Sequence, residues 1–214
     1  MNTTALTDSS RNMIEVTGEG TVAAAPDRAL ITLGAITEKA SLSEAQTENA
    51  GTVSSILQSL FQLGIPKEKV QTVQYGIEIQ YNYKEGVQTF RGYKVTHLLR
   101  VTADKIEQTG GIVDTAVRHG ANTVSGIQFT SAHPEAYYNQ ALTMAVHSSR
   151  QKAATLAKAM GVALHPTPVR IQEASQSIEP RPYQMASFAA AAATPIQPGE
   201  LNISAVVKAY YSYS

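Results

Sequence analysis

Residues 72–83 alternate between apolar and polar side chains more regularly than any other part of the chain. The odd positions carry Val73, Tyr75, Ile77, Ile79, Tyr81 and Tyr83, and the positions between them are polar or glycine. A period of two is that of a β-strand, and it predicts one buried and one wetter face. Lys84-Glu85-Gly86 predicts a turn, and the alternation resumes on the return at Tyr93, Val95, His97, Leu99 and Val101. The sequence therefore predicts a long antiparallel hairpin.

Similar patterns place the other elements along the chain. Strands are predicted at 14–19, 28–37, 123–130, 168–173 and 201–209, and helices at 41–63, 104–119 and 134–160. The predicted order is β-β-α-β-β-α-β-α-β-β. Paired strands mixed with helices indicate an α+β fold, with antiparallel β-sheets and helices packed on one face.

The helix ends carry recognisable signals. Ser41 with Glu44, and Asp104 with Glu107, fit capping boxes at two helix starts. Pro134 suits the first turn of the longest helix. Glycines follow two helices, and they predict left-handed C-terminal caps at Gly64 and Gly161. The apolar face of the longest helix is predicted to contain Tyr138, Leu142, Ala145, Ser149, Ala153, Leu156 and Met160.

Two segments differ in composition from the rest. Residues 1–12 are polar and turn-prone, which predicts a flexible arm ahead of one domain at 13–214. Residues 175–199 are rich in alanine and proline, unlike a buried element. An excursion of this length is typically functional or disordered.

The charge and cysteine counts exclude several classes of function. Lys plus Arg and Asp plus Glu both number 17, so there is no general attraction to nucleic acid and little repulsion between copies. The absence of cysteine excludes disulfides, thiolate catalysis and iron–sulfur clusters. The five histidines have no metal-ligand spacing. We therefore predict no cofactor, no metal and no nucleic-acid partner.

The chain start and the apolar runs bear on location. The first residues do not form a signal peptide, so the sequence as written predicts a cytoplasmic protein, or an exported or cell-envelope protein if the chain is processed or truncated. No apolar run approaches the ~18–20 residues of a transmembrane helix, so no membrane-spanning segment is expected.

The segment Gly18-Glu19-Gly20-Thr21-Val22-Ala23 matches the G-x-G-x-x-G/A pattern of dinucleotide-binding turns. Such a site needs a helix that opens at the turn, whereas Ala25-Pro26-Asp27 and another strand follow here. We therefore interpret the two glycines as structural, at a bend or bulge between strands.

The sequence gives little support for catalysis. It contains no G-x-S-x-G elbow, no P-loop, no H-E-x-x-H motif and no calcium loop. An enzyme with an unfamiliar site built from Asp27, His97 or Arg100 is the catalytic alternative. His97 lies on an apolar strand face, where a lone histidine is usually a satisfied core group.

Aromatic side chains are the candidates for an interface. The predicted hairpin holds four tyrosines, for which we expect core packing or an oligomer interface, because tyrosine is favoured at interfaces between proteins. A stacking platform for single-stranded nucleic acid would also need a basic groove, which the charge balance does not favour. The residues that we predict for an oligomer interface are Tyr75, Tyr81, Tyr83, Tyr93, Tyr183 and Phe188.

Six segments, in order, resemble the SIMPL-domain family. They are VTGEGTVAAAPDRALITLG at 16–34, LGIPKEKVQT at 63–72, RGYKVTHLLRV at 91–101, VDTAVRHGANTVSGIQF at 113–129, RQKAATLAKAMGV at 150–162 and TPIQPGELNISAVV at 194–207. The resemblance implies helices on antiparallel sheet, and roles in stress tolerance, as cell-envelope antigens or in kinase-associated signalling. It also implies relatives that build large hollow oligomers. It supplies no catalytic residues.

Two functions follow as hypotheses. The first is a non-enzymatic protein that self-assembles into a homo-oligomer, with a structural or stress-protective role. The second is a monomeric or small-oligomer module that binds a ligand or peptide, or acts as a signalling adaptor, with its site under residues 175–199.

Overall fold

The computed structural model describes residues 12–181 and 194–214, which form two compact units. The first unit contains residues 12–25, 133–181 and 200–214. The second contains residues 26–132 and 194–199. Most of the predicted arm, and residues 182–193 of the predicted excursion, lie outside the described residues.

The order of the long elements is the predicted one, and the α+β class is confirmed. Short 3₁₀ turns at Lys67–Lys69 and Ile106–Gln108 precede β3 and α2. The elements are β1 Met13–Ala24, β2 Arg28–Lys39, α1 Leu42–Gln62, β3 Val70–Lys84, β4 Val87–Ala103, α2 Thr109–Arg118, β5 Thr123–Thr130, α3 Pro134–Met160, β6 Arg170–Arg181 and β7 Glu200–Ser212.

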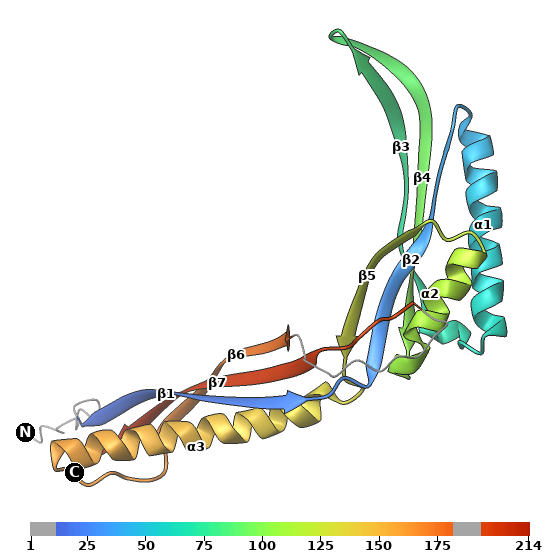
Figure 1. The fold of residues 1–214 in the computed structure, drawn as a ribbon. Coiled ribbons are helices and arrows are strands. Elements are labelled where there is room, and N and C mark those ends of the chain that lie inside the picture. Colours follow the sequence, from blue (N-terminus) through green and yellow to red (C-terminus); the bar gives the residue numbers. More distant parts are fainter. Residues whose placement is uncertain (1–11, 182–193) are drawn as a thin grey trace, which may run out of the picture. The chain divides into compact units, whose positions relative to one another are not determined.

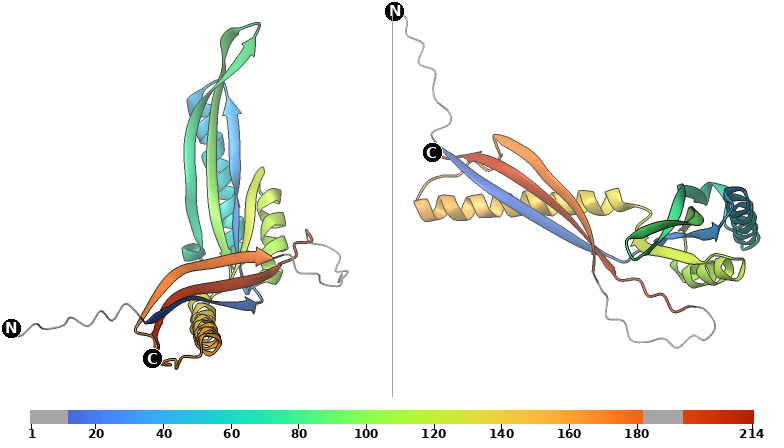
Figure 2. Two further views of the ribbon diagram at one scale, coloured as in Figure 1. Left: turned by 90° about the vertical axis from the view of Figure 1, so that its left-hand side faces the viewer. Right: turned by 90° about the horizontal axis from the view of Figure 1, so that it is seen from above.

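The first unit is a three-stranded antiparallel sheet with one helix on one face. The strand order is β1-β7-β6, so the last strand lies in the middle, as predicted. Helix α3 runs along the sheet (Figure 2). Its core combines Ile14 and Val16 of β1 with Tyr211 of β7, whose hydroxyl bonds the buried Ser149 of α3 at 3.0 Å.

Helix α3 buries small side chains and leaves large ones exposed. The buried positions recur every four residues, at Ala141, Ala145, Ser149, Ala153 and Ala157. The prediction that Leu156 and Met160 lie on the buried face was wrong, since they are 45% and 52% exposed. A stripe of small side chains lets the helix backbone approach the sheet closely.

Two glycines of β1 make this approach possible. A Cβ atom at Gly18 would lie 2.0 Å from the carbonyl oxygen of Ala145, and one at Gly20 would lie 2.1 Å from that of Ala141. The register with β7 is continuous through both, so the expectation of a bend or bulge was wrong. The glycines are structural because α3 crosses directly over them.

The second unit is a four-stranded antiparallel sheet of order β3-β4-β2-β5 with two helices on one face. The alternating apolar residues of β2 and β4 share one core with residues of these helices. Figure 1 shows α1 and α2 on the same side of the sheet. The core includes Ile31 and Leu33 of β2, Leu99 of β4, Ile56 of α1 and Ile112 of α2.

Some predicted helix ends are confirmed and others are not. Neither predicted capping box forms: Ser41 makes no side-chain cap bond, and Asp104 instead binds Arg28 and Lys69. Gly64 has a φ of 92° and, with Ile65, completes a Schellman motif through bonds to the carbonyls of Phe61 and Leu60. Tertiary ion pairs compete for acidic side chains, whereas a left-handed glycine has no such competitor.

Strand β6 continues beyond the predicted end of its strand. It pairs with β7 as far as Arg181, so the excursion predicted from residue 175 begins within a strand. Pro180 is consistent with the position of β6 at the edge of its sheet, since proline within sheets is confined to edge strands, strand starts and bulges.

Candidate interaction surface on the β3–β4 hairpin

The outer half of the β3–β4 hairpin has no further strand beside it among the described residues. Strand β2 ends at Lys39, which lies opposite Tyr93 of β4, and Tyr93 lies opposite Ile79 of β3. Helix α1 begins three residues after β2, at Leu42. The hairpin therefore extends past both elements, as Figure 1 shows.

One face of this hairpin is apolar and exposed, and we call it the hairpin face. Its members are Tyr75, Ile77, Ile79, Tyr81, Tyr83, Phe90 and Tyr93, which cross-strand pairing places on one side. Six of them are exposed, by fractions that range from 40% at Ile77 to 74% at Tyr83, and Tyr93 is half-buried. The prediction that this face is buried was wrong. Tyr75 and Ile77 lie on the edge strand β3, with β4 between them and β2, and the part of the hairpin beyond Ile79 extends past β2 and α1. Contiguous exposed apolar surface of this kind marks interaction sites in soluble proteins.

Several of the aromatic rings are held by their neighbours. The rings of Phe90 and Tyr93 make an edge-to-face contact at 5.4 Å, and those of Tyr75 and His97 make another at 5.3 Å. The Tyr75 hydroxyl also accepts a bond from the Gln46 amide of α1 at 3.3 Å. Such contacts restrict side-chain rotation in the free protein, which lowers the entropy cost of binding.

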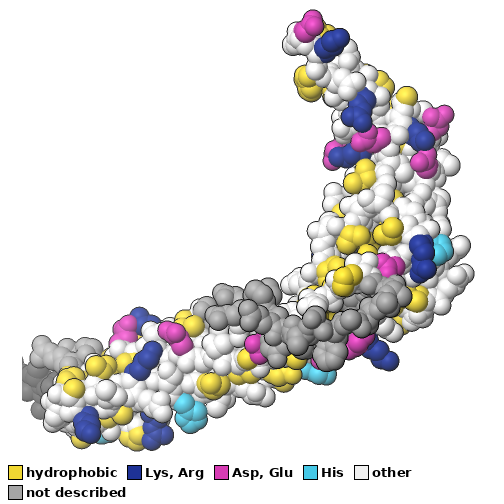
Figure 3. All heavy atoms as spheres, viewed as in Figure 1, with side chains coloured by type: hydrophobic (Ala, Val, Ile, Leu, Met, Phe, Trp, Pro, Cys, Tyr) yellow, Lys and Arg dark blue, Asp and Glu magenta, His cyan; other side chains and the backbone are white. Residues whose placement is uncertain are grey.

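The opposite face of the hairpin carries charges in pairs. Lys94 binds Glu78 at 2.7 Å, and Arg91 binds Glu38 at 2.6 Å. The Lys94 ammonium lowers the pKa of the Glu78 carboxyl by hydrogen bonding and charge. Basic and acidic side chains lie next to one another in this region in Figure 3. Hence one face of the hairpin is polar, with its charged side chains in ion pairs, and the other face is apolar.

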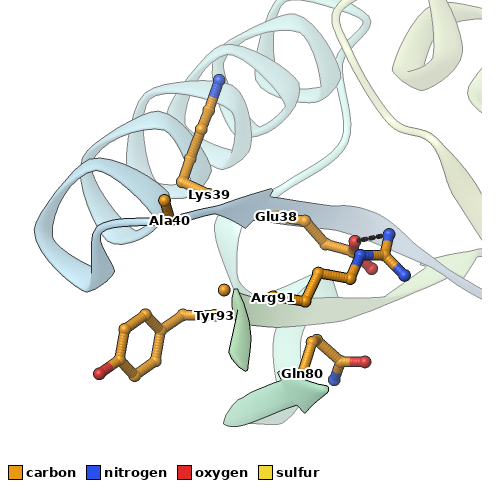
Figure 4. A pocket seen from close by; sticks show the side chains of 7 residues that line it. Glu38, Lys39, Ala40, Gln80, Arg91 and Tyr93 are labelled. Carbon is orange, nitrogen blue, oxygen red and sulfur yellow. Dashed lines mark hydrogen bonds and ion pairs between the residues drawn. The ribbon is translucent and has the colours of Figure 1, made fainter. Parts of the chain in front are cut away.

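A small hollow of about 220 Å³ lies where the hairpin leaves β2 (Figure 4). Its lining includes Glu38 and Arg91, which are paired with each other, and Tyr93. Gly92 is needed here, because a Cβ atom would lie 2.6 Å from the carbonyl oxygen of Lys39. The lining includes the bulge at Arg91, and its charged groups are already paired, Arg91 with Glu38 and Lys39 with Glu48 of α1.

The three residues of the catalytic alternative are not brought together. Arg100 and His97 are three positions apart on β4, so their side chains point to opposite faces of the sheet. Asp27 precedes β2, and its carboxylate accepts the Ala132 N–H at 2.6 Å. Because His97 lies opposite Ala35, eight residues of β2 separate it from Asp27, or about 26 Å.

His97 has a structural environment. Its Nε2 atom lies 3.0 Å from the Thr72 hydroxyl, and Tyr75 contacts its ring. Burial lowers the pKa of the imidazole, which favours the neutral form. Among the described residues no three histidine or acidic side chains cluster closely enough to hold a metal ion.

A second hollow lies beside α2, next to the described end of the excursion. Its volume is about 580 Å³, and Leu63, Val117 and Arg118 contribute to its lining. Thr194 borders it and donates two bonds to the Asp114 carboxylate, at 2.5 Å from its hydroxyl and 3.1 Å from its N–H. These bonds lower the pKa of Asp114.

The predicted interface residues divide into two groups. Tyr75, Tyr81, Tyr83 and Tyr93 share the hairpin face, whereas Tyr183 and Phe188 lie outside the described residues. Phe90 was missed. Its pairing with Tyr81 depends on the bulge at Arg91, and the sequence carries only Gly92 as a signal of it.

The sequence matches one protein family and several known bacterial proteins. Residues 14–211 match the SIMPL family, described as a protein of unknown function (DUF541). The chain is 32% identical over 180 residues to the 26 kDa periplasmic immunogenic protein of Brucella melitensis, which covers 82% of this chain and 72% of the relative. It is 22% identical over 144 residues to the uncharacterized protein YggE of Escherichia coli (strain K12), covering 67% and 58%. Within the described part of the chain, no helix combines the length and apolar character needed to cross a membrane.

Proposed function

The chain belongs to the SIMPL family, and from that premise we propose that it is a non-enzymatic protein that assembles with copies of itself. The observation that carries the proposal is the hairpin face. It presents apolar side chains on a projecting hairpin, and each exposed member leaves 40% or more of its surface in water.

Burial of such a surface would drive association. Each square ångström of apolar surface removed from water contributes about 25 cal/mol. Aromatic side chains are enriched where interfaces are strongest, and this face carries several beside two isoleucines. The chain has a formal net charge of zero, so copies approach one another without long-range repulsion.

The described site geometry favours this function over catalysis. The charged groups around the hollow of Figure 4 are engaged in ion pairs, and Asp27, His97 and Arg100 are dispersed. The relatives are named for immunogenicity and location, or are uncharacterized.

We further propose that the assembly acts in the cell envelope, in a structural or stress-protective role. Support comes from the relative of Brucella melitensis, whose name places that protein in the periplasm. Fractionation of cells producing this chain with a C-terminal tag tests the location. The proposal expects the protein in the envelope fraction, and a signal confined to the cytosol contradicts it.

Light scattering after size exclusion, at two protein concentrations, tests self-assembly. The proposal expects a discrete mass well above 22.9 kDa that does not change on dilution. A mass near 22.9 kDa at both concentrations contradicts it.

The second hollow, which forms a groove beside α2, supports a second candidate, a ligand- or peptide-binding module. The groove is partly apolar at Leu63 and Val117, and Arg118 offers a cation at its border. A thermal-shift screen with short peptides and carboxylates tests it, with Val117→Asp as the site variant. A shift that is present in the parent and lost in this variant supports binding at the groove. The absence of any shift in the parent removes this candidate.

A further inference from the structure

The sheet edges of this protein differ in how they are protected against pairing with another chain. An exposed edge strand offers free N–H and C=O groups, and proteins block such edges with lysine, proline, bulges or short strands. In β1 the ammonium of Lys152 binds the carbonyl oxygen of Thr17 at 2.8 Å. Strand β6 contains Pro180 and a bulge at Ala174, and β5 has eight residues with a bulge at Ser125.

Strand β3 has little of this protection. It is the other edge of the four-stranded sheet and the longer of the two, with 15 residues. Its own bulge, at Val73, lies near its start, and the pairing at Arg91 places the second extra residue on β4. From Gln74 to Lys84 the strand is regular, contains no proline, and carries one charged residue before its end, Glu78. The backbone groups directed away from β4 meet no other described strand.

We propose that β3 pairs edge to edge with β3 of a second copy, antiparallel about a two-fold axis at Ile79. This inference rests on the proposed self-assembly and specifies its contact. A two-fold axis makes the contact isologous, so that each copy contributes the same surface.

The alternation along β3 limits the possible registers. On one face of a joint sheet, odd positions must lie beside odd positions if the apolar side chains of the two copies are to meet. A shift by one residue would set every apolar side chain beside a polar one. The axis must therefore pass through a residue of β3.

Three axis positions can then be compared. An axis at Glu78 would set two carboxylates directly opposite each other, which is destabilising. An axis at Tyr81 would pair Glu78 with Lys84 of the other copy, but only residues 78–84 could pair. An axis at Ile79 pairs residues 74–84 and keeps the carboxylates apart.

The axis at Ile79 also uses every odd-numbered residue in the regular part of β3, from Tyr75 to Tyr83. It sets Tyr75 against Tyr83 of the other copy, Ile77 against Tyr81, and Ile79 against itself. The ion pair offered by the axis at Tyr81 adds little, because Glu78 is already bound by Lys94 and both positions are exposed. The longer backbone ladder, and three kinds of apolar pair against two for the axis at Tyr81, therefore favour Ile79.

Single-cysteine variants test this register directly, because the chain contains no cysteine of its own. Only a residue on the two-fold axis lies opposite the same residue of the other copy, so Ile79→Cys should form a disulfide-linked dimer under mild oxidation. In Ile77→Cys the two sulfur-bearing positions would lie four residues apart along the strand, about 13 Å. That distance exceeds the reach of a disulfide, so the dimer band should be lost. The double variant Ile77→Cys with Tyr81→Cys should recover it.

Light scattering of the reduced variants separates the possible failures. An oligomer in which Ile79→Cys fails to cross-link overturns edge pairing at this residue and leaves self-assembly standing. Equal cross-linking of Ile77→Cys, Ile79→Cys and Tyr81→Cys also overturns it, because stacked faces have no single axial residue. Cross-linking of Tyr81→Cys alone overturns the choice of axis. A monomeric mass overturns both the inference and the proposed function. Far-UV circular dichroism confirms that each variant is folded.

Discussion

Substitution of Gly18 by alanine is expected to destabilise the first unit severely. The new Cβ would lie 2.0 Å from the carbonyl oxygen of Ala145 and 2.6 Å from the backbone N of Ser149, whereas ordinary contacts lie at 3.4–4 Å. Relief of the first contact requires the two backbones to separate by about 1.4 Å, since the obstacle is the backbone of α3 rather than a flexible side chain. Movement of the helix would loosen the buried stripe from Ala141 to Ala157. Overpacking of this kind costs about 3 kcal/mol.

Urea unfolding followed by circular dichroism measures this cost. With a slope of about 2 kcal/mol per molar urea, a loss of about 3 kcal/mol lowers the midpoint by roughly 1.5 M. Gly51→Ala is the control, because nothing lies within 4 Å of the added Cβ in α1 and alanine favours a helix by about 1 kcal/mol. A free energy of unfolding for Gly18→Ala within about 0.5 kcal/mol of the parent would refute the close approach of α3 to β1.

Two other variants test the second unit. Asn49→Ala removes the buried amide that donates to the carbonyl oxygens of Ala35 and Val95 at 3.0 and 3.3 Å. Urea unfolding should show that the free energy of unfolding falls by about 2 kcal/mol. No change in it would mean that these bonds do not hold α1 on the sheet. Burial lowers the pKa of His97, so the folded state resists protonation more than the unfolded state and stability falls as pH drops through the ordinary value of 6.5. Unfolding of His97→Gln at a series of pH values should show a weaker fall in that window, and an unchanged fall would assign it to other groups.

The long elements were predictable because their signals are local. The alternation of Ala29, Ile31, Leu33 and Ala35 marked β2, and all four are fully buried. Gly64 and Gly161 marked two helix ends, and both have positive φ. A period of side chains and a left-handed glycine are properties of neighbouring residues, so the sequence is sufficient to read them.

The burial of individual side chains was less predictable, because it depends on which other elements pack against a strand or helix. The face that begins at Tyr75 has the pattern of a buried strand, yet it is exposed because β3 is an edge strand and because β2 and α1 end before the outer half of the hairpin does. In α3 the alanine stripe is buried instead of Leu156 and Met160 because Gly18 and Gly20 of β1 face it. Both outcomes require the lengths and the side chains of two elements at once.

For the same reason, only part of the candidate interaction surface could be predicted from the sequence. The tyrosines of the hairpin were found by their spacing, and the structure places four of them together. Phe90 joins them only through the bulge at Arg91, and the open edge of β3 follows from its place in the strand order. Neither is a property of the local sequence.

If the hairpin face joins copies of this chain, a charge placed on that face should separate them, and the masses of two neighbouring variants show whether it does. Tyr81→Lys places a charge on the hairpin face, whereas Asn82→Lys places the same charge on the opposite face of the same strand. By light scattering, Tyr81→Lys should have a mass near 22.9 kDa, whereas the parent and Asn82→Lys should both be oligomers. An oligomer of parental mass in Tyr81→Lys would contradict assembly through the hairpin face.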